Sequence, residues 1–183
     1  YLLGAQKGWI VLSPRKQSGM SLIELLITLA IVGIVLMAGA GSFATWVGNT
    51  QIRTVAEAQQ AGLRFARNEA MKRNTPVQIQ FDADYRGWTI TDVPTAAVIK
   101  QEAGLATYTQ ITTTAQPAAA SVVVFDGLGR QTPLNNVAPI TRLDVDAPNM
   151  AANDSRELAI LISPAGGIRL CRPDRVAPDP AAC

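Results

Sequence analysis

The sequence predicts an α+β protein in which a long N-terminal helix, apolar in its first half, packs its second half on an antiparallel β-sheet head. Three observations carry this prediction. An uncharged stretch runs from Leu25 to Ile52, a helical period continues to Asn74, and an alternating period of two begins at Val77. The chain of 183 residues is long enough for one domain with a core.

The apolar stretch that starts at Leu25 is long enough to cross a membrane, since about 20 helical residues span the hydrocarbon at ~1.5 Å each. A secretory signal peptide would have a shorter apolar core of about 7 to 15 residues. Arg15 and Lys16 precede the stretch, and Arg53 is the first charge after it. By the positive-inside rule we expect a single span with a cytoplasmic N-terminus and the head outside the cytoplasm.

The composition argues against an enzyme. The chain has no histidine, which excludes a Ser-His-Asp triad and any zinc site that uses histidine. Its two cysteines cannot complete an all-cysteine zinc site. The net charge is +2, but from Met20 onward 13 basic residues face 14 acidic ones, so the basic pI is no evidence for a nucleic-acid-binding body. We expect no catalytic residue, no cofactor and no metal.

Two short acidic motifs have plain structural interpretations. Asp82 and Asp84 begin like a calcium loop, but Val93 stands where the bidentate glutamate would be, so we interpret the motif as a turn. Asp144 and Asp146 would share one face of a strand, where a solvated edge is favoured over an ion site.

Glu24 is the unusual residue, because it lies at the head of the apolar run. A carboxylate costs about 2.5 to 3.5 kcal/mol at the centre of a bilayer and less near the interface. Glu24 therefore either pairs with a cation in the membrane or stays at the interface.

The residues around Glu24 resemble the class III signal of type IV pilins and pseudopilins, with Gly19, then Met20-Ser21-Leu22-Ile23-Glu24, then an apolar helix. The resemblance implies that a prepilin peptidase cuts between Gly19 and Met20 and methylates the new N-terminus. It also implies that Glu24, at mature position five, pairs with the N-terminal amine of a neighbouring subunit and sets the register between subunits. Met20 stands where phenylalanine is usual.

A second segment, from Leu63 to Phe81, resembles the GspH/FimT branch of this family. With the N-terminal signal the likeness covers residues 19 to 81. It implies a pilin-like fold with four parts: a prepilin leader over 1–19, a transmembrane half-helix over 20–48, an outer half-helix over 49–75, and a β head over 76–183.

The outer half-helix carries one apolar stripe at steps of three and four, which a sheet can cover: Ile52, Val55, Gln59, Leu63, Ala66 and Ala70. Pro76 predicts its end, because the residue before proline avoids the α region. Arg53, Arg64 and Arg67 form a basic edge beside the stripe. That edge is either a solvated flank with an Arg53–Glu57 pair or a contact with another subunit or a polyanion.

Strands of the head are predicted from alternation and turn residues at Val77–Phe81, Trp88–Thr91, Tyr108–Thr113, Ser121–Phe125, Arg142–Asp146, Glu157–Ile162 and Ile168–Cys171. The segments 92–120 and 131–155 are rich in Ala, Thr, Pro and Asn, and we predict long loops there with an edge strand.

Cys171 and Cys183 enclose a short, proline-rich segment near the C-terminus. If the head lies outside the cytoplasm, we expect a disulfide that ties this segment to the last strand, contributing up to about 3 kcal/mol. The alternative is two free thiols.

DNA is a second candidate ligand, because some FimT-type minor pilins bind transforming DNA through a basic C-terminal motif. The corresponding cations here are Arg169, Arg172 and Arg175, but the first arginine of the motif is absent and Asp174 and Asp179 oppose them. The site would be small.

The resemblance implies a non-enzymatic minor pilin or pseudopilin of the GspH/FimT type, in the bacterial inner membrane with a periplasmic head, that helps initiate or cap a filament. Its partners would be other minor pilins or pseudopilins, the major pilin and the prepilin peptidase. Two likenesses to FimT and FimU proteins, Gly41–Phe43 and Ala66–Ala70, favour a type IV pilus over a type II secretion pseudopilus. The alternatives are a DNA-binding minor pilin and a membrane-anchored adhesin.

Overall fold

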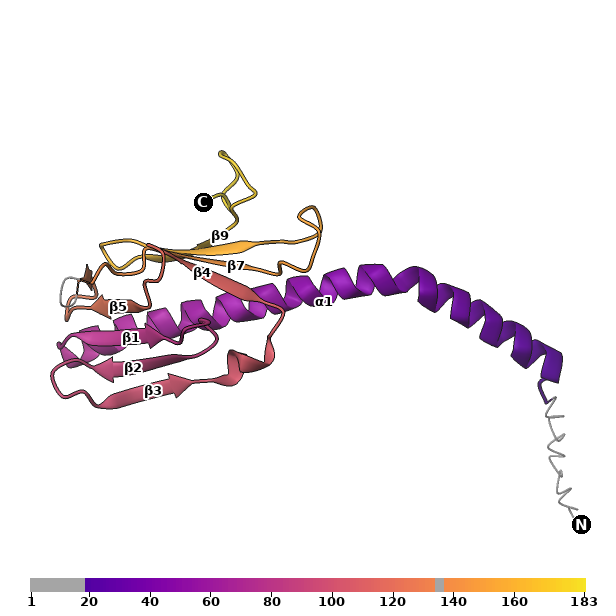
Figure 1. Ribbon diagram of the computed structural model, residues 1–183, viewed down its shortest axis with the longest axis horizontal. Coiled ribbons are helices and arrows are strands. Elements are labelled where there is room, and N and C mark those ends of the chain that lie inside the picture. Colours follow the sequence, from indigo (N-terminus) through magenta and orange to yellow (C-terminus); the bar gives the residue numbers. More distant parts are fainter. Residues whose placement is uncertain (1–18, 134–136) are drawn as a thin grey trace, which may run out of the picture. The chain divides into compact units, whose positions relative to one another are not determined.

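The computed structural model describes residues 19–133 and 137–183 (Figure 1). The predicted leader therefore lies outside the described residues except for Gly19, as do three residues of the predicted loop over 131–155. Two compact units make up the chain, one ending at Ala40 and one running from Gly41 to Cys183. Helix α1 (Leu22–Arg73) contributes to both units.

Helix α1 confirms the predicted helix to within two residues at each end. It stops where the sequence indicates. Asn74 takes a left-handed conformation with φ of 53°, which asparagine tolerates well, and the Thr75 amide donates to the Ala70 carbonyl at 3.3 Å. Pro76 then leads into the first strand. Within the described ranges, α1 alone is long and apolar enough to cross a membrane.

The head contains two antiparallel sheets, whereas the sequence predicted one. The first has five strands in the order β3-β2-β1-β5-β6. Its strands are β1 (Val77–Phe81), β2 (Trp88–Asp92), β3 (Val98–Glu102), β5 (Val122–Phe125) and β6 (Gln131–Thr132).

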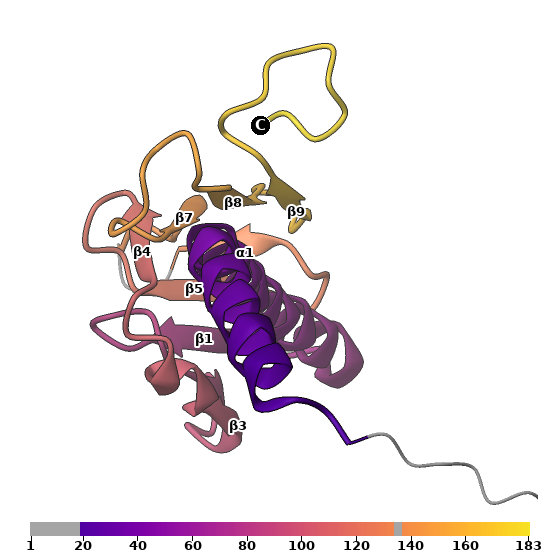
Figure 2. The same cartoon turned by 90° about the vertical axis from the view of Figure 1, so that its right-hand side faces the viewer.

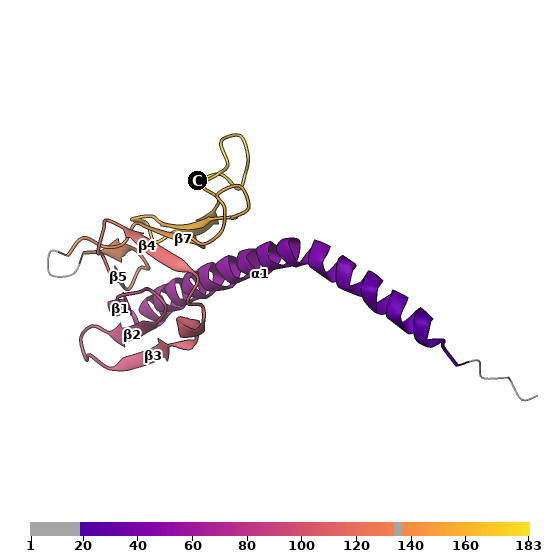
Figure 3. The same ribbon diagram turned by 45° about the vertical axis from the view of Figure 1, so that its right-hand side comes forward.

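The second sheet has four strands in the order β4-β7-β8-β9, again all antiparallel. Its strands are β4 (Thr112–Gln116), β7 (Arg142–Asp146), β8 (Leu158–Ile162) and β9 (Ile168–Cys171). Figure 2 shows strands of both sheets beside α1, and in Figures 1 and 3 the C-terminal loop projects from the end of β9.

One strand prediction needs correction. The strand predicted over Tyr108–Thr113 is β4 at Thr112–Gln116, because a 3₁₀ turn at Gly104–Thr107 and the bend after it occupy the preceding residues. Strand β3 falls inside the segment 92–120, at the edge of the first sheet, which agrees with the edge strand predicted within the loops. Its bounds could not be predicted, because among its apolar residues Ile99 alone packs against the core and the alternation is weak.

The predicted apolar stripe of the outer half-helix is confirmed, because all six of its residues are buried. Leu63, Ala66 and Ala70 pack in a core with residues of both sheets, and Ile52 and Val55 pack in a second cluster with Ile111 and Val145. Each sheet thus covers part of the same helix face.

Gln59 is the polar member of the stripe and is fully buried. Its Nε2 donates to the Tyr85 carbonyl at 2.9 Å, in the turn between β1 and β2, and to the Thr113 hydroxyl of β4 at 3.0 Å. One side chain therefore connects the helix to both sheets. These hydrogen bonds offset part of the cost of burying the amide nitrogen.

Gly62 lets the helix approach the first sheet closely. A Cβ atom at this position would lie 2.7 Å from the indole ring of Trp88, which is closer than a van der Waals contact allows. The glycine is therefore required by packing, since any side chain would push the helix away from β2.

Candidate functional site

The N-terminal unit presents the residues that the sequence singled out. Gly19 and Met20 are exposed and precede α1, and Glu24 lies in the first turn of the helix. The Leu25 amide donates to the Ser21 carbonyl at 3.1 Å, which starts the helical ladder.

Glu24 is exposed and has no cationic partner among the residues that the structure describes, since none of the ion pairs includes it. A carboxylate that enters lipid is stable only when a cation accompanies it. A counter-charge for Glu24 in a membrane must therefore come from outside these residues.

The surface around Glu24 is almost continuously apolar. The exposed large apolar side chains of this unit are Met20, Leu22, Ile23, Leu25, Leu26, Ile27, Leu29, Ile31, Val32, Ile34, Val35, Leu36 and Met37. A soluble monomer does not leave such a surface in water. Lipid or the helices of other subunits must cover it.

The two cysteines of the head form a disulfide between Cys171, at the end of β9, and Cys183, with Cα atoms 5.1 Å apart. An isolated parallel bridge between Arg172 and Ala182 brings the segment back beside the strand end. The bond therefore closes a C-terminal loop, which is the arrangement expected of an oxidised head.

Replacing both cysteines by serine (Cys171→Ser, Cys183→Ser) is expected to lower the stability of the head. Opening this loop removes at most about 3 kcal/mol in the chain-entropy model, which corresponds to a fall in melting temperature of up to about 10 °C. Thermal unfolding of the full chain in detergent measures the change. Dithiothreitol serves as the control, because it should destabilise the parent chain and leave the serine variant unaffected.

The three arginines proposed for DNA are not gathered into a free cationic surface. The Arg172 guanidinium donates to Asp174 through Nε at 3.0 Å and through Nη2 at 2.7 Å, and Arg175 lies 3.6 Å from both Asp174 and Asp179. Arg169 donates to the Cys183 carbonyl at 3.1 Å. Two carboxylates thus neutralise two of the three cations. Fewer counterions would be released when these arginines contact DNA phosphates, which weakens the expected DNA affinity.

The arginines of the basic edge of α1 have different partners. Arg53 pairs with Glu57 at 2.7 Å, as one interpretation of the sequence predicted, and Arg67 donates to the Gly129 carbonyl at 3.1 Å. The solvated-flank interpretation therefore holds at Arg53, whereas Arg67 fastens the helix to the turn after β5.

The acidic motifs have structural partners. The segment from Asp82 is the turn between β1 and β2, with the Tyr85 amide donating to the Asp82 carbonyl at 3.0 Å. Asp144 pairs with Arg142 at 2.6 Å. In residues 19–133 and 137–183, no group of three Cys, Asp or Glu side chains is placed to hold a metal ion.

Glu157, just before β8, lies in an environment that disfavours its ionised form. Burial raises the pKa of Glu157 above its ordinary value, and the nearby charges of Asp146 and Asp144 raise it further. Glu69 on α1 shows the opposite effect, because a hydrogen bond from Arg73 lowers the pKa of Glu69. The two residues provide a matched comparison.

We expect Glu157→Gln to raise the melting temperature at pH 7, by about 1 to 3 °C for a partly exposed charge. A raised pKa means that the folded state disfavours the ionised form of Glu157. The stability that the protonated side chain contributes to the fold is therefore lost as pH rises through its folded pKa. The difference should vanish near pH 4, where both states bind the proton. Thermal melts across pH 4 to 8 test this, and Glu69→Gln should be less stable than the parent at pH 7. A Glu157→Gln variant less stable at pH 7 would contradict the assignment.

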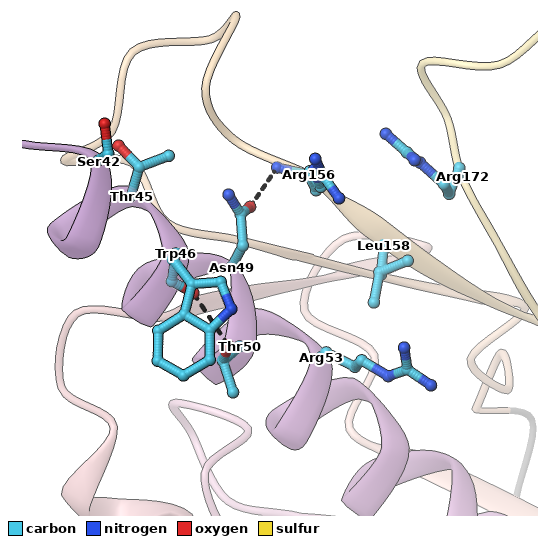
Figure 4. A pocket seen from close by; sticks show the side chains of 9 residues that line it. All are labelled: Ser42, Thr45, Trp46, Asn49, Thr50, Arg53, Arg156, Leu158 and Arg172. Carbon is cyan, nitrogen blue, oxygen red and sulfur yellow. Dashed lines mark hydrogen bonds between the residues drawn. The ribbon is translucent and has the colours of Figure 1, made fainter.

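A groove at the start of the second unit was not anticipated from the sequence (Figure 4). It has a volume of about 530 Å³ and is lined by Ser42, Thr45, Trp46, Asn49, Thr50, Arg53, Arg156, Leu158 and Arg172. Asn49 holds its two sides together, since its amide donates to the Asp154 carbonyl at 2.9 Å and accepts from the Arg156 amide at 2.7 Å. Arg156 and Asn49 are too far apart in sequence for any local pattern to have paired them.

An apolar, membrane-length helix whose later part carries an antiparallel β head defines the class of type IV pilin-like subunits. The family model for the prokaryotic N-terminal methylation motif matches residues 14–40, and that for the type II transport protein GspH matches residues 55–166. Because this second match covers more than half of the chain, the protein belongs to the GspH family, whose members are structural pilin or pseudopilin subunits.

Two solved structures share the fold, both of the type IV minor pilin FimU from Pseudomonas aeruginosa (strain PAO1). One has a TM-score of 0.54 and 21% identity, covering 68% of this chain and 91% of that chain. The other, from a second crystal form, has a TM-score of 0.50 and 23% identity, covering 64% and 90%. No curated protein sequence matches the chain significantly.

Proposed function

We propose that this protein is a minor pilin of the GspH/FimT type that helps to initiate or cap a type IV pilus after processing by a prepilin peptidase. The observation that carries the proposal is the exposed apolar first part of α1, up to Ala40, which contains a single carboxylate, Glu24, near its start. The family match and the fold shared with FimU support it.

The peptidase would cut between Gly19 and Met20 and leave a helix that begins with a methylated amine. That amine is a cation near neutral pH, and Glu24 of an adjoining subunit would neutralise it in the membrane. The exposed apolar side chains of the N-terminal unit would then exchange lipid for the helices of other minor pilins and of the major pilin. The protein acts as a structural subunit of the filament, anchored in the inner membrane with its head in the periplasm.

Deleting the gene in the bacterium that encodes it distinguishes a pilus from a secretion machine. We expect surface filaments to disappear, because initiation fails, while the release of type II secretion substrates continues. Electron microscopy of the cells and assay of secreted protein give the two readouts, and plasmid-borne wild-type protein should restore the filaments. Lost secretion with normal filaments would assign the subunit to a pseudopilus and contradict the proposal.

A further inference from the structure

We propose that the groove lined by Trp46, Arg53, Arg156 and Arg172 binds the phosphate-bearing headgroup of an anionic phospholipid from the outer leaflet of the membrane that the subunit occupies. The inference goes beyond the subunit role and rests on the proposed function only in requiring that the apolar helix spans the membrane.

The position of the groove in the chain favours a membrane-surface ligand. Its first residue, Ser42, follows Ala40, the last residue of the N-terminal unit, by two positions. Trp46 follows Ala40 by six positions, which limits their separation along a helix to about 9 Å. The groove therefore starts where the headgroup layer begins if the apolar run spans the hydrocarbon.

Two aromatic side chains mark the same level. Phe43 and Trp46 are 65% and 63% exposed, and their ring centroids lie 5.8 Å apart. Exposed aromatic rings of this kind are typical of the boundary between hydrocarbon and water, where an amphipathic indole is stable. Two large aromatic rings side by side are unfavourable in bulk water, so we expect this part of α1 to lie at the membrane surface.

The charges of the groove favour an anion. Arg53 comes from α1, Arg156 from the segment before β8, and Arg172 directly follows β9, yet all three line one groove (Figure 4). Glu57 and Asp174 pair with Arg53 and Arg172, whereas no carboxylate of the described residues forms an ion pair with Arg156. One positive charge therefore remains uncompensated in the groove.

The groove is also held in shape without a ligand. Asn49 of α1 accepts from the backbone amide of Arg156, which fixes the arginine's main chain against the helix at 2.7 Å. Guanidinium groups bind phosphate oxygens through paired, charge-assisted hydrogen bonds, and the hydroxyl groups of Ser42 and Thr45, which also line the groove, can donate to further oxygens. Trp46 and Leu158 supply the apolar wall that the glycerol part of a lipid would contact.

Native mass spectrometry of the full chain, released from nanodiscs of equal parts phosphatidylglycerol and phosphatidylcholine, tests the proposal. The wild type is expected to retain phosphatidylglycerol over phosphatidylcholine. The double variant Arg156→Gln, Arg172→Gln should reduce this preference by about 30-fold, given that each of the two arginines near an anionic surface contributes about 1 kcal/mol.

The matched control is Arg130→Gln, Arg142→Gln, which removes the same charge from residues that pair with Asp126 and Asp144 and do not line the groove. It should keep the wild-type preference. Thermal melts of both variants verify that the head remains folded. Millimolar inorganic phosphate should leave the retained lipid unchanged, and displacement of the lipid by phosphate would overturn the lipid as the source of the anion.

Equal retention of the two lipids by the inserted wild type, or equal loss of preference in both double variants, would overturn the proposal. A third result would also overturn it: the groove variant keeps the wild-type lipid preference but no longer co-purifies with other pilin subunits. That result would assign the groove to an acidic partner protein. A chain that fails to insert into nanodiscs would instead contradict the membrane-spanning role in the proposed function.

Discussion

Gly19→Leu is expected to block maturation completely, leaving only the precursor in the membrane. A peptidase that cuts after glycine must bring the scissile carbonyl close to its catalytic groups, and a branched side chain at that residue would prevent the approach. The substitution should not disturb the part of the chain that the structure describes, since a Cβ atom at Gly19 meets none of its atoms within 4 Å. Immunoblots of membranes, with and without the co-expressed peptidase, measure the fraction that is cleaved.

Gly33→Leu provides the matched control for this variant. Gly33 also has open space around it and lies within the apolar part of α1, so the same substitution leaves the cleavage point intact. The Gly33 variant should be processed to the mature size. Normal processing of Gly19→Leu would contradict cleavage between Gly19 and Met20.

Glu24→Ala is expected to leave cleavage intact and to reduce the amount of protein in sheared filaments by at least about 100-fold. The variant leaves the methylated amine of a neighbour without its counter-charge in lipid, and an uncompensated buried charge costs about 3 to 5 kcal/mol. Quantitative mass spectrometry of the filament fraction, normalised to mature protein in the membrane, gives the measurement.

Two further variants make the Glu24 result specific. Glu24→Gln keeps the size and the hydrogen-bonding capacity but not the charge, and it should fail as the alanine variant does. Glu57→Ala removes an exposed glutamate of the same helix that pairs with Arg53, and it should incorporate normally. Filaments containing Glu24→Gln at wild-type levels would show that charge pairing does not direct assembly.

The helix and its buried face could be predicted because the signals are local. The stripe from Ile52 to Ala70 repeats at helical spacing, Pro76 marks the end, and Asn74 is a residue that tolerates the left-handed conformation found there. The motif from Gly19 to Glu24 is equally local, so the candidate processing and assembly residues were recognisable before any fold was known.

The division of the head into two sheets could not be predicted, since strand pairing depends on contacts between distant residues. Strand β1 pairs with β2 and β5, whereas β4, which lies between β3 and β5 in sequence, pairs with β7 in the other sheet. Alternation along a strand indicates which of its faces is buried, but it does not identify the neighbouring strands.

The arginine-lined groove was missed for the same reason. In the sequence, Arg53 belongs to a basic helix edge, and Arg156 belongs to no motif. The hydrogen bond between Asn49 and the Arg156 amide joins residues separated by 107 positions. A site built from three elements becomes visible only when the fold brings those elements together.

The mass of the mature N-terminal peptide, taken from subunits recovered out of wild-type filaments, tests the central claim most directly. The account predicts a peptide that begins at Met20 with one methyl group on its α-amine and contains an unmodified Glu24. Recovery of subunits that still contain the residues before Met20 would contradict it. So would wild-type filaments from which the protein is absent, even if deleting its gene abolishes those filaments.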